Sequence, residues 1–380
     1  MEKDIEKPET GAFALRPSWH SLAAMRILIL LASAFLVVFP LPAQAQSWPV
    51  KEGDVTLADF RFASGETMKS LKMHYTTLGT PRRGKDGEVE NAVMVLHGTG
   101  GSGKQFLAPQ FADELYGPGH PLDISRWYVI LPDNIGHGAS SKPSDGLRMG
   151  FPGYDYADMI EAQRRMLTEG LGVKRLELIL GTSMGCMHAF VWGETHPGFA
   201  RRLAPFACLP AEIAGLNRAW RKLSIDAIKA DPAWKGGNYA AQPGLGMRTA
   251  ASLLLVAGAN PLALQAQYPT RTAAEAYLET AYTRTASGRD ANDLIYQLDA
   301  SRGYDPAPGL EKIAVPVLWI NSADDFINPP GYGITEAAVK RMPRARFILI
   351  PASADTKGHG THTWAKFWKA DLAKLLSEQP

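Results

Sequence analysis

Residues 181–185, Gly-Thr-Ser-Met-Gly, lie between two apolar segments. Residues 176–180 before them predict a buried strand, and the segment after them predicts a helix through Glu194. A G-x-S-x-G sequence between a strand and a helix is typical of a sharp turn that exposes a serine hydroxyl above a parallel sheet. Glycines on both sides leave room for a turn too tight for Cβ atoms. The sequence therefore predicts a nucleophile at Ser183.

Other segments of the chain predict the sheet around this turn. Apolar runs predict further strands at 92–98, 127–138, 315–322 and 345–351. Apolar residues at a helical period predict helices within 154–173, near 333–342 and at 363–377. Residues 47–90 alternate between hydrophobic and polar and predict an antiparallel hairpin. Strands that alternate with helices indicate an α/β fold with a mostly parallel sheet and helices on both faces.

This alternation lapses between residues 211 and 303. Here the sequence predicts helices joined by Pro and Gly breaks, with no strand among them. We therefore expect an α/β core made of residues 46–210 and 304–380, with residues 211–303 inserted as a helical cap or lid.

A serine hydroxyl needs a base to become nucleophilic at neutral pH, and the base needs a carboxylate to orient it. In this type of fold the acid and then the histidine follow the serine along the chain. Asp324 and Asp325 follow a predicted strand, and His359 and His362 lie in the loop after the next one. We predict Asp325 as the acid and His359, which glycines flank, as the base. Asp324 and His362 are the alternatives.

Two backbone N–H groups are expected to stabilise the oxyanion of a tetrahedral intermediate. One belongs to Met184 at the start of the helix, and the other to Thr99 in the glycine-rich loop after an early strand. This loop also resembles a phosphate-binding loop, but Gln105 occupies the position where that motif requires Ser or Thr for magnesium. We expect neither a metal nor an organic cofactor.

Residues 1–45 contain the features of a signal peptide. One basic residue follows Met25, an apolar run extends from Ile27 to Leu41, and an Ala-Gln-Ala sequence ends at Ala45. The run is shorter than the roughly 20 residues that a membrane span needs. We expect translation from Met25, cleavage after Ala45 and a periplasmic or secreted protein, with an uncleaved membrane anchor as the alternative.

Charge and cysteine content limit the possible partners. The formal net charge is +2, and the sequence has no basic run interleaved with aromatic residues, so nothing indicates a nucleic-acid partner. The two cysteines, Cys186 and Cys208, lie in apolar surroundings. We expect buried free thiols rather than a disulfide, because spacing alone cannot establish one pair.

These motifs together resemble the α/β-hydrolase superfamily and, within it, the homoserine O-acetyltransferase family, over most of residues 50–375. Residues 181–197 are similar to that family's serine turn and the helix after it. Residues 133–143 and 151–167 are similar to the segment that leads into this turn, and residues 227–250 to the opening of the family's helical lid. The resemblance implies an acyl-enzyme on Ser183, a small ester or acyl substrate and a homodimer.

The sequence departs from this family at positions that bear on the substrate. Family transferases typically follow the catalytic histidine with an aspartate placed to hold the ammonium group of the substrate, whereas this chain has Gly360. The Thr-Tyr-Arg-Ser stretch of the family's lid has no counterpart in residues 250–261. An export signal would also separate the enzyme from cytoplasmic acetyl-CoA. Asp355 or Asp324 could substitute as an anchor for the ammonium group.

We therefore expect an exported serine hydrolase that cleaves a small ester or acyl compound. An O-acyltransferase of the homoserine O-acetyltransferase type is the alternative, because both activities share the acyl-enzyme and differ only in the acceptor. A non-catalytic binding protein on the same scaffold is a third reading, which the complete set of triad residues disfavours.

Overall fold

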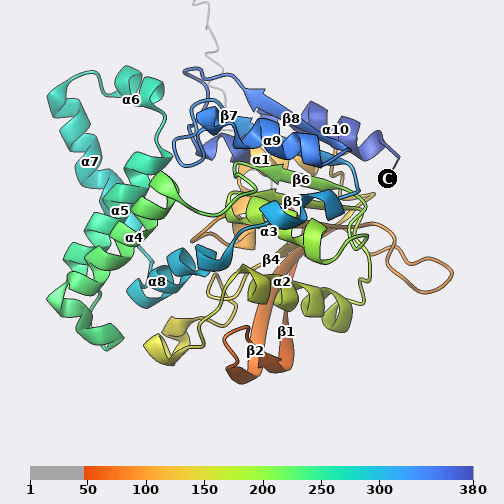
Figure 1. The fold of residues 1–380 in the computed structure, drawn as a ribbon, viewed down its shortest axis with the longest axis horizontal. Helices are drawn as coiled ribbons and strands as arrows, with labels where there is room; N and C mark the ends of the chain where they lie inside the picture. Colours follow the sequence, from red (N-terminus) through yellow and green to blue (C-terminus); the bar gives the residue numbers. More distant parts are fainter. Residues whose placement is uncertain (1–46, 380) are drawn as a thin grey trace, which may run out of the picture. The chain divides into compact units, whose positions relative to one another are not determined.

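The computed structural model describes residues 47–379, which fall within one compact unit, Ala45–Pro380. The predicted signal peptide lies outside the described residues. The described strands form one sheet with the order β1-β2-β4-β3-β5-β6-β7-β8 (Figure 1). Their bounds are β1 Val50–Arg61, β2 Thr67–Leu78, β3 Ala92–Leu96, β4 Tyr128–Pro132, β5 Leu178–Thr182, β6 Leu203–Phe206, β7 Val317–Ser322 and β8 Ala345–Ile350.

The sheet is mostly parallel, as the alternation of strands and helices predicts. Strands β1 and β2 form the expected antiparallel hairpin, with Val50 opposite Leu78, and β2 is antiparallel to β4. The strands from β4 through β8 in the sheet order are all parallel. The carboxyl ends of β5, β7 and β8 therefore meet at one edge of the sheet, where the three predicted catalytic residues follow them.

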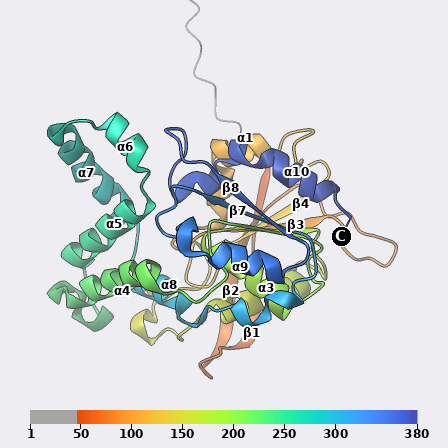
Figure 2. The ribbon, with the colours of Figure 1, turned by 45° about the horizontal axis from the view of Figure 1, so that its top comes forward.

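Helices cover both faces of the sheet. Helices α1 (Pro109–Leu115) and α10 (Lys369–Ser377) lie on one face, and α2 (Tyr156–Arg165), α3 (Met184–Thr195) and α9 (Ile334–Arg341) lie on the other (Figure 2). Alternate side chains of a strand point to opposite faces. Val93 and Val95 therefore pack in the core on the side of α1 and α10, while Met94 and Leu96 pack in the core on the side of α2, α3 and α9. Strands buried on both faces explain the continuous apolar runs of the sequence.

Residues 211–303 form a group of helices with no strand among them, and the structure describes all of these residues. The helices are α4 Gly215–Ala230, α5 Gly244–Gly258, α6 Pro261–Gln267, α7 Arg271–Ala286 and α8 Ala291–Asp299. Helices α4 to α7 gather on one side of the sheet (Figures 1 and 2). Helices α4, α5 and α8 pack through a core cluster of their own that includes Trp220, Met247 and Leu294. Within residues 47–379 no single helix is long and apolar enough to cross a membrane; only α5 and α6 together, bent by 104°, reach that length and composition.

Three features of the fold differ from the sequence-based expectation. Strand β6 and helix α1 were not predicted, and both are short, with a proline inside β6 and another at the first position of α1. Helix α10 begins six residues later than expected. Short 3-10 turns at Gly360–Thr363 and Ala365–Phe367 precede it, and the Trp368 indole donates a hydrogen bond to the carbonyl of His362.

Candidate active site

The G-x-S-x-G segment forms a sharp turn between β5 and α3. Ser183 has φ 54° and ψ −111°, a conformation that is strained for a residue with a side chain. A Cβ atom on Gly181 would lie 1.9 Å from the carbonyl oxygen of Gly185, and one on Gly185 would lie 2.1 Å from that of Leu96. The two glycines are therefore required by direct backbone contact, which is the physical reason for the motif.

The structure brings together the three residues predicted as a catalytic triad. The Ser183 hydroxyl donates a hydrogen bond to Nε2 of His359 at 2.8 Å. Nδ1 of His359 donates to Oδ2 of Asp325 at 2.9 Å. This chain can take the proton from a serine as it attacks a carbonyl and stabilise the imidazolium that results.

Asp325 and Asp324 have different partners. The Asp325 side chain is fully buried, and its Oδ1 accepts hydrogen bonds from the N–H groups of Ile327 at 2.9 Å and Asn328 at 3.0 Å. Asp324 does not reach His359; its Oδ2 instead accepts from the Thr356 hydroxyl at 2.8 Å and from the Gly358 N–H at 3.1 Å. Asp324 therefore fixes the loop that carries the histidine, and its carboxylate is not free to anchor a substrate.

His362 lies beside the triad without joining it. Its ring centroid is 5.0 Å from that of His359, and its Nδ1 is buried without a hydrogen-bond partner among the described residues. Burial, reinforced by the neighbouring His359, lowers the pKa of His362 well below its usual value. His362 is therefore a neutral neighbour of the base at neutral pH.

The loop with Thr99 lies against the serine turn. A Cβ atom on Gly98 would be 3.2 Å from Cβ of Ser183, so the next residue, Thr99, borders the space in front of the nucleophile. The N–H group of Met184 lies in the first turn of α3, where backbone N–H groups have no acceptor within the helix. The geometry is compatible with the two predicted oxyanion donors.

This loop contacts a network of buried polar side chains. The sequence analysis did not predict this network. Nδ1 of His97 donates a hydrogen bond to the Gly98 carbonyl at 2.8 Å, so Nε2 of the neutral ring is an acceptor. The backbone N–H of Asn134 donates to this Nε2 at 3.1 Å, and the Asn134 amide lies 3.0 Å from it. Burial lowers the pKa of His97, which favours this neutral form.

The network continues beneath α3. The Gln163 amide donates to the Asn134 carbonyl oxygen and to Nδ1 of His188, the latter at 3.1 Å, and the Trp192 indole donates to the Gln163 carbonyl oxygen at 2.7 Å. Burial lowers the pKa of His188 to about 3. The only sequence signal for this network was polar residues within otherwise apolar segments.

Cys186 and Cys208 form a disulfide bond, so the expectation of free thiols was wrong. Cys186 lies in the first turn of α3, and Cys208 lies just after β6, with 5.8 Å between their Cα atoms. The two segments are neighbours because β5, which leads into α3, is paired with β6. The missed strand β6 is therefore the reason that the pairing was not recognised.

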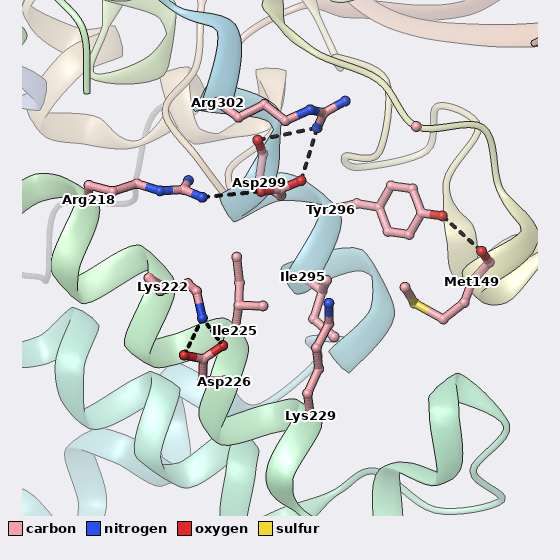
Figure 3. Close-up of a pocket in the computed structure, with 11 residues that line it drawn as sticks. Met149, Arg218, Lys222, Ile225, Asp226, Lys229, Ile295, Tyr296, Asp299 and Arg302 are labelled. Atoms are coloured by element: carbon pink, nitrogen blue, oxygen red, sulfur yellow. Dashed lines mark hydrogen bonds and ion pairs between the residues drawn. The ribbon is translucent and has the colours of Figure 1, made fainter. Parts of the chain in front are cut away.

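Several cavities adjoin the helical segment. One of about 400 Å³ is bordered by Thr99, by the loop before His359 and by helices α5 to α7. A second, of about 370 Å³, lies between α4 and α8 (Figure 3), and neither of these two cavities is lined by Ser183, Asp325 or His359. Among residues 47–379 no group of three or more His, Cys, Asp or Glu side chains is arranged to hold a metal ion.

Comparison with known proteins agrees with the observed fold. The family described as alpha/beta hydrolase fold matches residues 91–355. A homoserine O-acetyltransferase of Pelobacter propionicus is 28% identical over 318 residues, which cover 74% of this chain and 84% of that protein. The structure of homoserine O-acetyltransferase from Bacillus anthracis has a TM-score of 0.77 at 23% identity and covers 87% of this chain and 98% of that one.

An esterase has a similar fold. The structure of an acetylester hydrolase from Corynebacterium glutamicum has a TM-score of 0.75 at 19% identity and covers 86% of this chain and 96% of that one. The matched family spans most of the chain, including the serine turn and Asp325. The chain belongs to the α/β-hydrolase fold family and is an enzyme similar to the homoserine O-acetyltransferases.

Proposed function

We propose that the protein is an O-acyltransferase that carries the acyl group on Ser183 and passes it to a hydroxyl group of a small molecule. The observation that carries this proposal is the continuous hydrogen-bond chain from Ser183 through His359 to Asp325. A strained serine in line with a histidine and a buried carboxylate is the arrangement that activates a nucleophile for acyl transfer.

In the proposed reaction His359 takes the proton as Ser183 attacks the carbonyl of the acyl donor. The negative charge that develops on the carbonyl oxygen is stabilised by the N–H groups of Met184 and Thr99. His359 then gives its proton to the leaving group. In the second half-reaction His359 removes a proton from the acceptor hydroxyl as its oxygen attacks the carbonyl of the acyl-serine. When the bond between this carbonyl and the Ser183 oxygen breaks, His359 returns the proton to Ser183, and the new ester leaves the free enzyme.

The choice of acceptor rests on the relatives. The similarity to homoserine O-acetyltransferases over most of both chains favours a hydroxyl acceptor over water. Hydrolysis of a small ester is the second candidate, and it is favoured by Gly360. A side chain at Gly360 would meet only Cβ of Lys357, at 3.7 Å, so that position is open and carries no carboxylate for the ammonium group of an amino acid.

The test is a comparison of acceptors with the mature protein. Transfer from acetyl-CoA or succinyl-CoA to L-homoserine and other small alcohols is measured beside hydrolysis of the same donors and of p-nitrophenyl esters. We expect transfer to at least one alcohol to exceed hydrolysis, and Ser183→Ala to abolish both activities. Hydrolysis that exceeds transfer with every acceptor would support the esterase instead. A Ser183 that neither turns over a donor nor reacts with a fluorophosphonate would contradict both.

We also propose that the α4 to α8 segment is a lid over the acyl site and that the protein is exported. The Cys186–Cys208 disulfide supports export, because disulfides persist in oxidising compartments. Mass spectrometry of the protein from the periplasm or medium should find an N-terminus at Gln46 and no free thiol. A membrane-bound product that begins at Met1, or two alkylatable cysteines, would contradict this. The homodimer stays a prediction.

A further inference from the structure

The cavity of about 400 Å³ beside Thr99 has an unusual distribution of charge. Its walls combine apolar side chains of α5 and α6, including Leu254, Leu255 and Leu264, with polar ones such as Asn260, Gln267 and Thr285. It is also lined by two cationic side chains, Arg289 and Lys357, and no Asp or Glu is among the lining residues. A cavity with positive charge and no acid is suited to a ligand that has both an apolar part and an anionic group.

The Arg289 guanidinium has no carboxylate partner among residues 47–379. The adjacent Asp290 is committed elsewhere. Its Oδ1 accepts from the Tyr239 hydroxyl at 2.7 Å and from the Asn292 N–H at 2.9 Å, while its Oδ2 accepts from the Gln242 amide at 2.9 Å. Partial burial lowers the pKa of Arg289, with no opposing effect from a nearby acid. An arginine stays protonated even so, and its guanidinium can bind a carboxylate or phosphate with two parallel hydrogen bonds.

Arg289 lies close to the loop that borders the nucleophile. A Cβ atom on Gly100 would be 2.4 Å from a terminal nitrogen of Arg289, so the guanidinium rests against the residue after Thr99. Gly98, on the other side of Thr99, faces Ser183. The loop of residues 98–100 therefore lies between Arg289 and the Ser183 side chain.

Lys357 approaches the cavity from the opposite side. It is two residues before His359, and its ammonium group has a cation–π contact with Trp364, 5.2 Å from the ring centroid. The loop that carries it touches the lid, because a Cβ atom on Gly358 would lie 2.5 Å from the carbonyl oxygen of Ala259. Lys357 thus belongs to the loop that carries His359, and Arg289 belongs to the connection between α7 and α8 that contacts the Thr99 loop.

We propose that this cavity binds an anionic group of the acyl substrate and that Arg289, assisted by Lys357, makes the enzyme selective for anionic acyl compounds. This inference rests on the acyl-enzyme function proposed for Ser183 and names its substrate class. The anion is a carboxylate or phosphate, and it lies either on the acyl chain, as in a half-ester of a dicarboxylic acid, or on the leaving group, as in a coenzyme A thioester.

The second cavity does not compete for this role. Figure 3 shows that its cations are largely paired: Arg218 lies 3.6 Å from Asp299, which also binds Arg302, and Lys222 lies 2.5 Å from Asp226. Its walls come from α4, α8 and nearby loops, and it includes neither Thr99 nor any residue of the loop before His359. An anion bound there would not touch the loops that carry the reacting groups.

The experiment compares matched neutral and anionic substrates in two arms. The first arm uses p-nitrophenyl butyrate and p-nitrophenyl hemisuccinate, which differ in a terminal methyl or carboxylate on the acyl chain. The second uses S-acetylpantetheine and S-acetyl-4′-phosphopantetheine, which differ in one phosphate of the leaving group. The quantity measured is the ratio of kcat/KM for the anionic compound to that for the neutral one.

We expect the wild-type ratio to favour the anionic compound in one arm, and that arm identifies where the anion lies. Arg289→Gln should lower this ratio about ten- to a hundredfold, the value of a lost hydrogen bond to a charged group. Lys357→Gln should lower it less, and Arg289→Lys should restore part of it. Arg284→Gln is the matched control, because it removes the same charge from an exposed position on α7 and should leave the ratio unchanged.

Three results would overturn the inference. A wild-type enzyme that turns over the neutral compounds through Ser183 but shows no anionic preference in either arm contradicts it and leaves the proposed function intact. If Arg289→Gln lowered kcat/KM equally for neutral and anionic substrates, Arg289 would have only a structural role in positioning the loop at Thr99. If Arg284→Gln lowered the ratio as much as Arg289→Gln, the preference for anionic substrates would come from the net charge of the protein and not from Arg289. Absence of any acylation of Ser183 would instead overturn the proposed function, and this inference with it.

Discussion

At the scale of single residues, the choice between neighbouring candidates depends on which backbone groups each side chain satisfies. Asp325 and Asp324 are adjacent, yet only Asp325 reaches His359, while Asp324 binds the hydroxyl of Thr356 and the N–H of Gly358. One aspartate orients the base and the other orients its loop. The residue types and chain order predicted the group of candidates, but these local hydrogen bonds could not be read from the sequence.

A prediction at this scale concerns the base. His359→Ala should lower the rate of Ser183 acylation by about a thousandfold or more, because the serine loses its proton acceptor. His362→Ala is the matched control. It removes a ring 5.0 Å away that bonds neither to Ser183 nor to Asp325, and it should keep most of the rate. Burst kinetics with a p-nitrophenyl ester measures acylation directly. The opposite pattern would assign the base to His362.

At the scale of secondary structure elements, the sequence predicted best the elements whose local pattern is strong. Strands β3, β4, β5 and β7 are buried along their whole length and appear as continuous apolar runs, so all four were expected, although β4 ends at Pro132 and not at residue 138. The edge strand β8 is only partly buried, but its sequence is also mostly apolar and it was expected near its observed bounds. Strand β6 has only four residues and contains a proline, and it exists because β5 and β7 pair with it from both sides. Such pairing over long sequence distances leaves no local signal.

The disulfide illustrates the same limit. Cys186 and Cys208 are separated by 22 residues, and nothing in that spacing identifies them as a pair. They meet because the parallel pairing of β5 with β6 places the start of α3 beside the end of β6. Cross-linking a loop of this length contributes about 3 kcal/mol to stability by restricting the unfolded chain. The bond also fixes the first turn of α3, which carries Met184, one of the two predicted oxyanion donors.

At the scale of the whole molecule, the candidate site is assembled from distant parts of the chain. Ser183 lies 176 residues from His359 in sequence, and His359 lies 34 residues from Asp325. The order of strands in the sheet brings these positions to one edge, which is why fold class alone was sufficient to predict their convergence. The charge of the cavity beside them was not predictable, because Arg289 and Lys357 come from the helical segment and from the loop after β8.

A prediction for the whole molecule concerns stability in acid. His97, His137 and His188 are buried beneath the active site, and burial lowers the pKa of each below its usual value. A histidine with a lowered pKa in the folded state contributes stability that is present above the unfolded pKa of about 6.5 and is lost as the pH falls. For one such group the loss is about 1.4 kcal/mol per pH unit below that value.

The contribution of one histidine can be isolated with His188→Leu, which removes the titrating ring and keeps an apolar side chain in the core. Urea unfolding of the wild type and the variant should show that the wild type loses about 2 kcal/mol more of its unfolding free energy than the variant between pH 7 and pH 5, because at pH 5 only the wild type gains a proton at residue 188 when it unfolds. Met187→Ala is the control for general weakening of α3, since Met187 is buried in the same helix and does not titrate. Met187→Ala should lower the unfolding free energy at both pH values. Its loss of unfolding free energy between pH 7 and pH 5 should equal that of the wild type. Parallel losses in the wild type and His188→Leu would show that His188 does not drive acid unfolding.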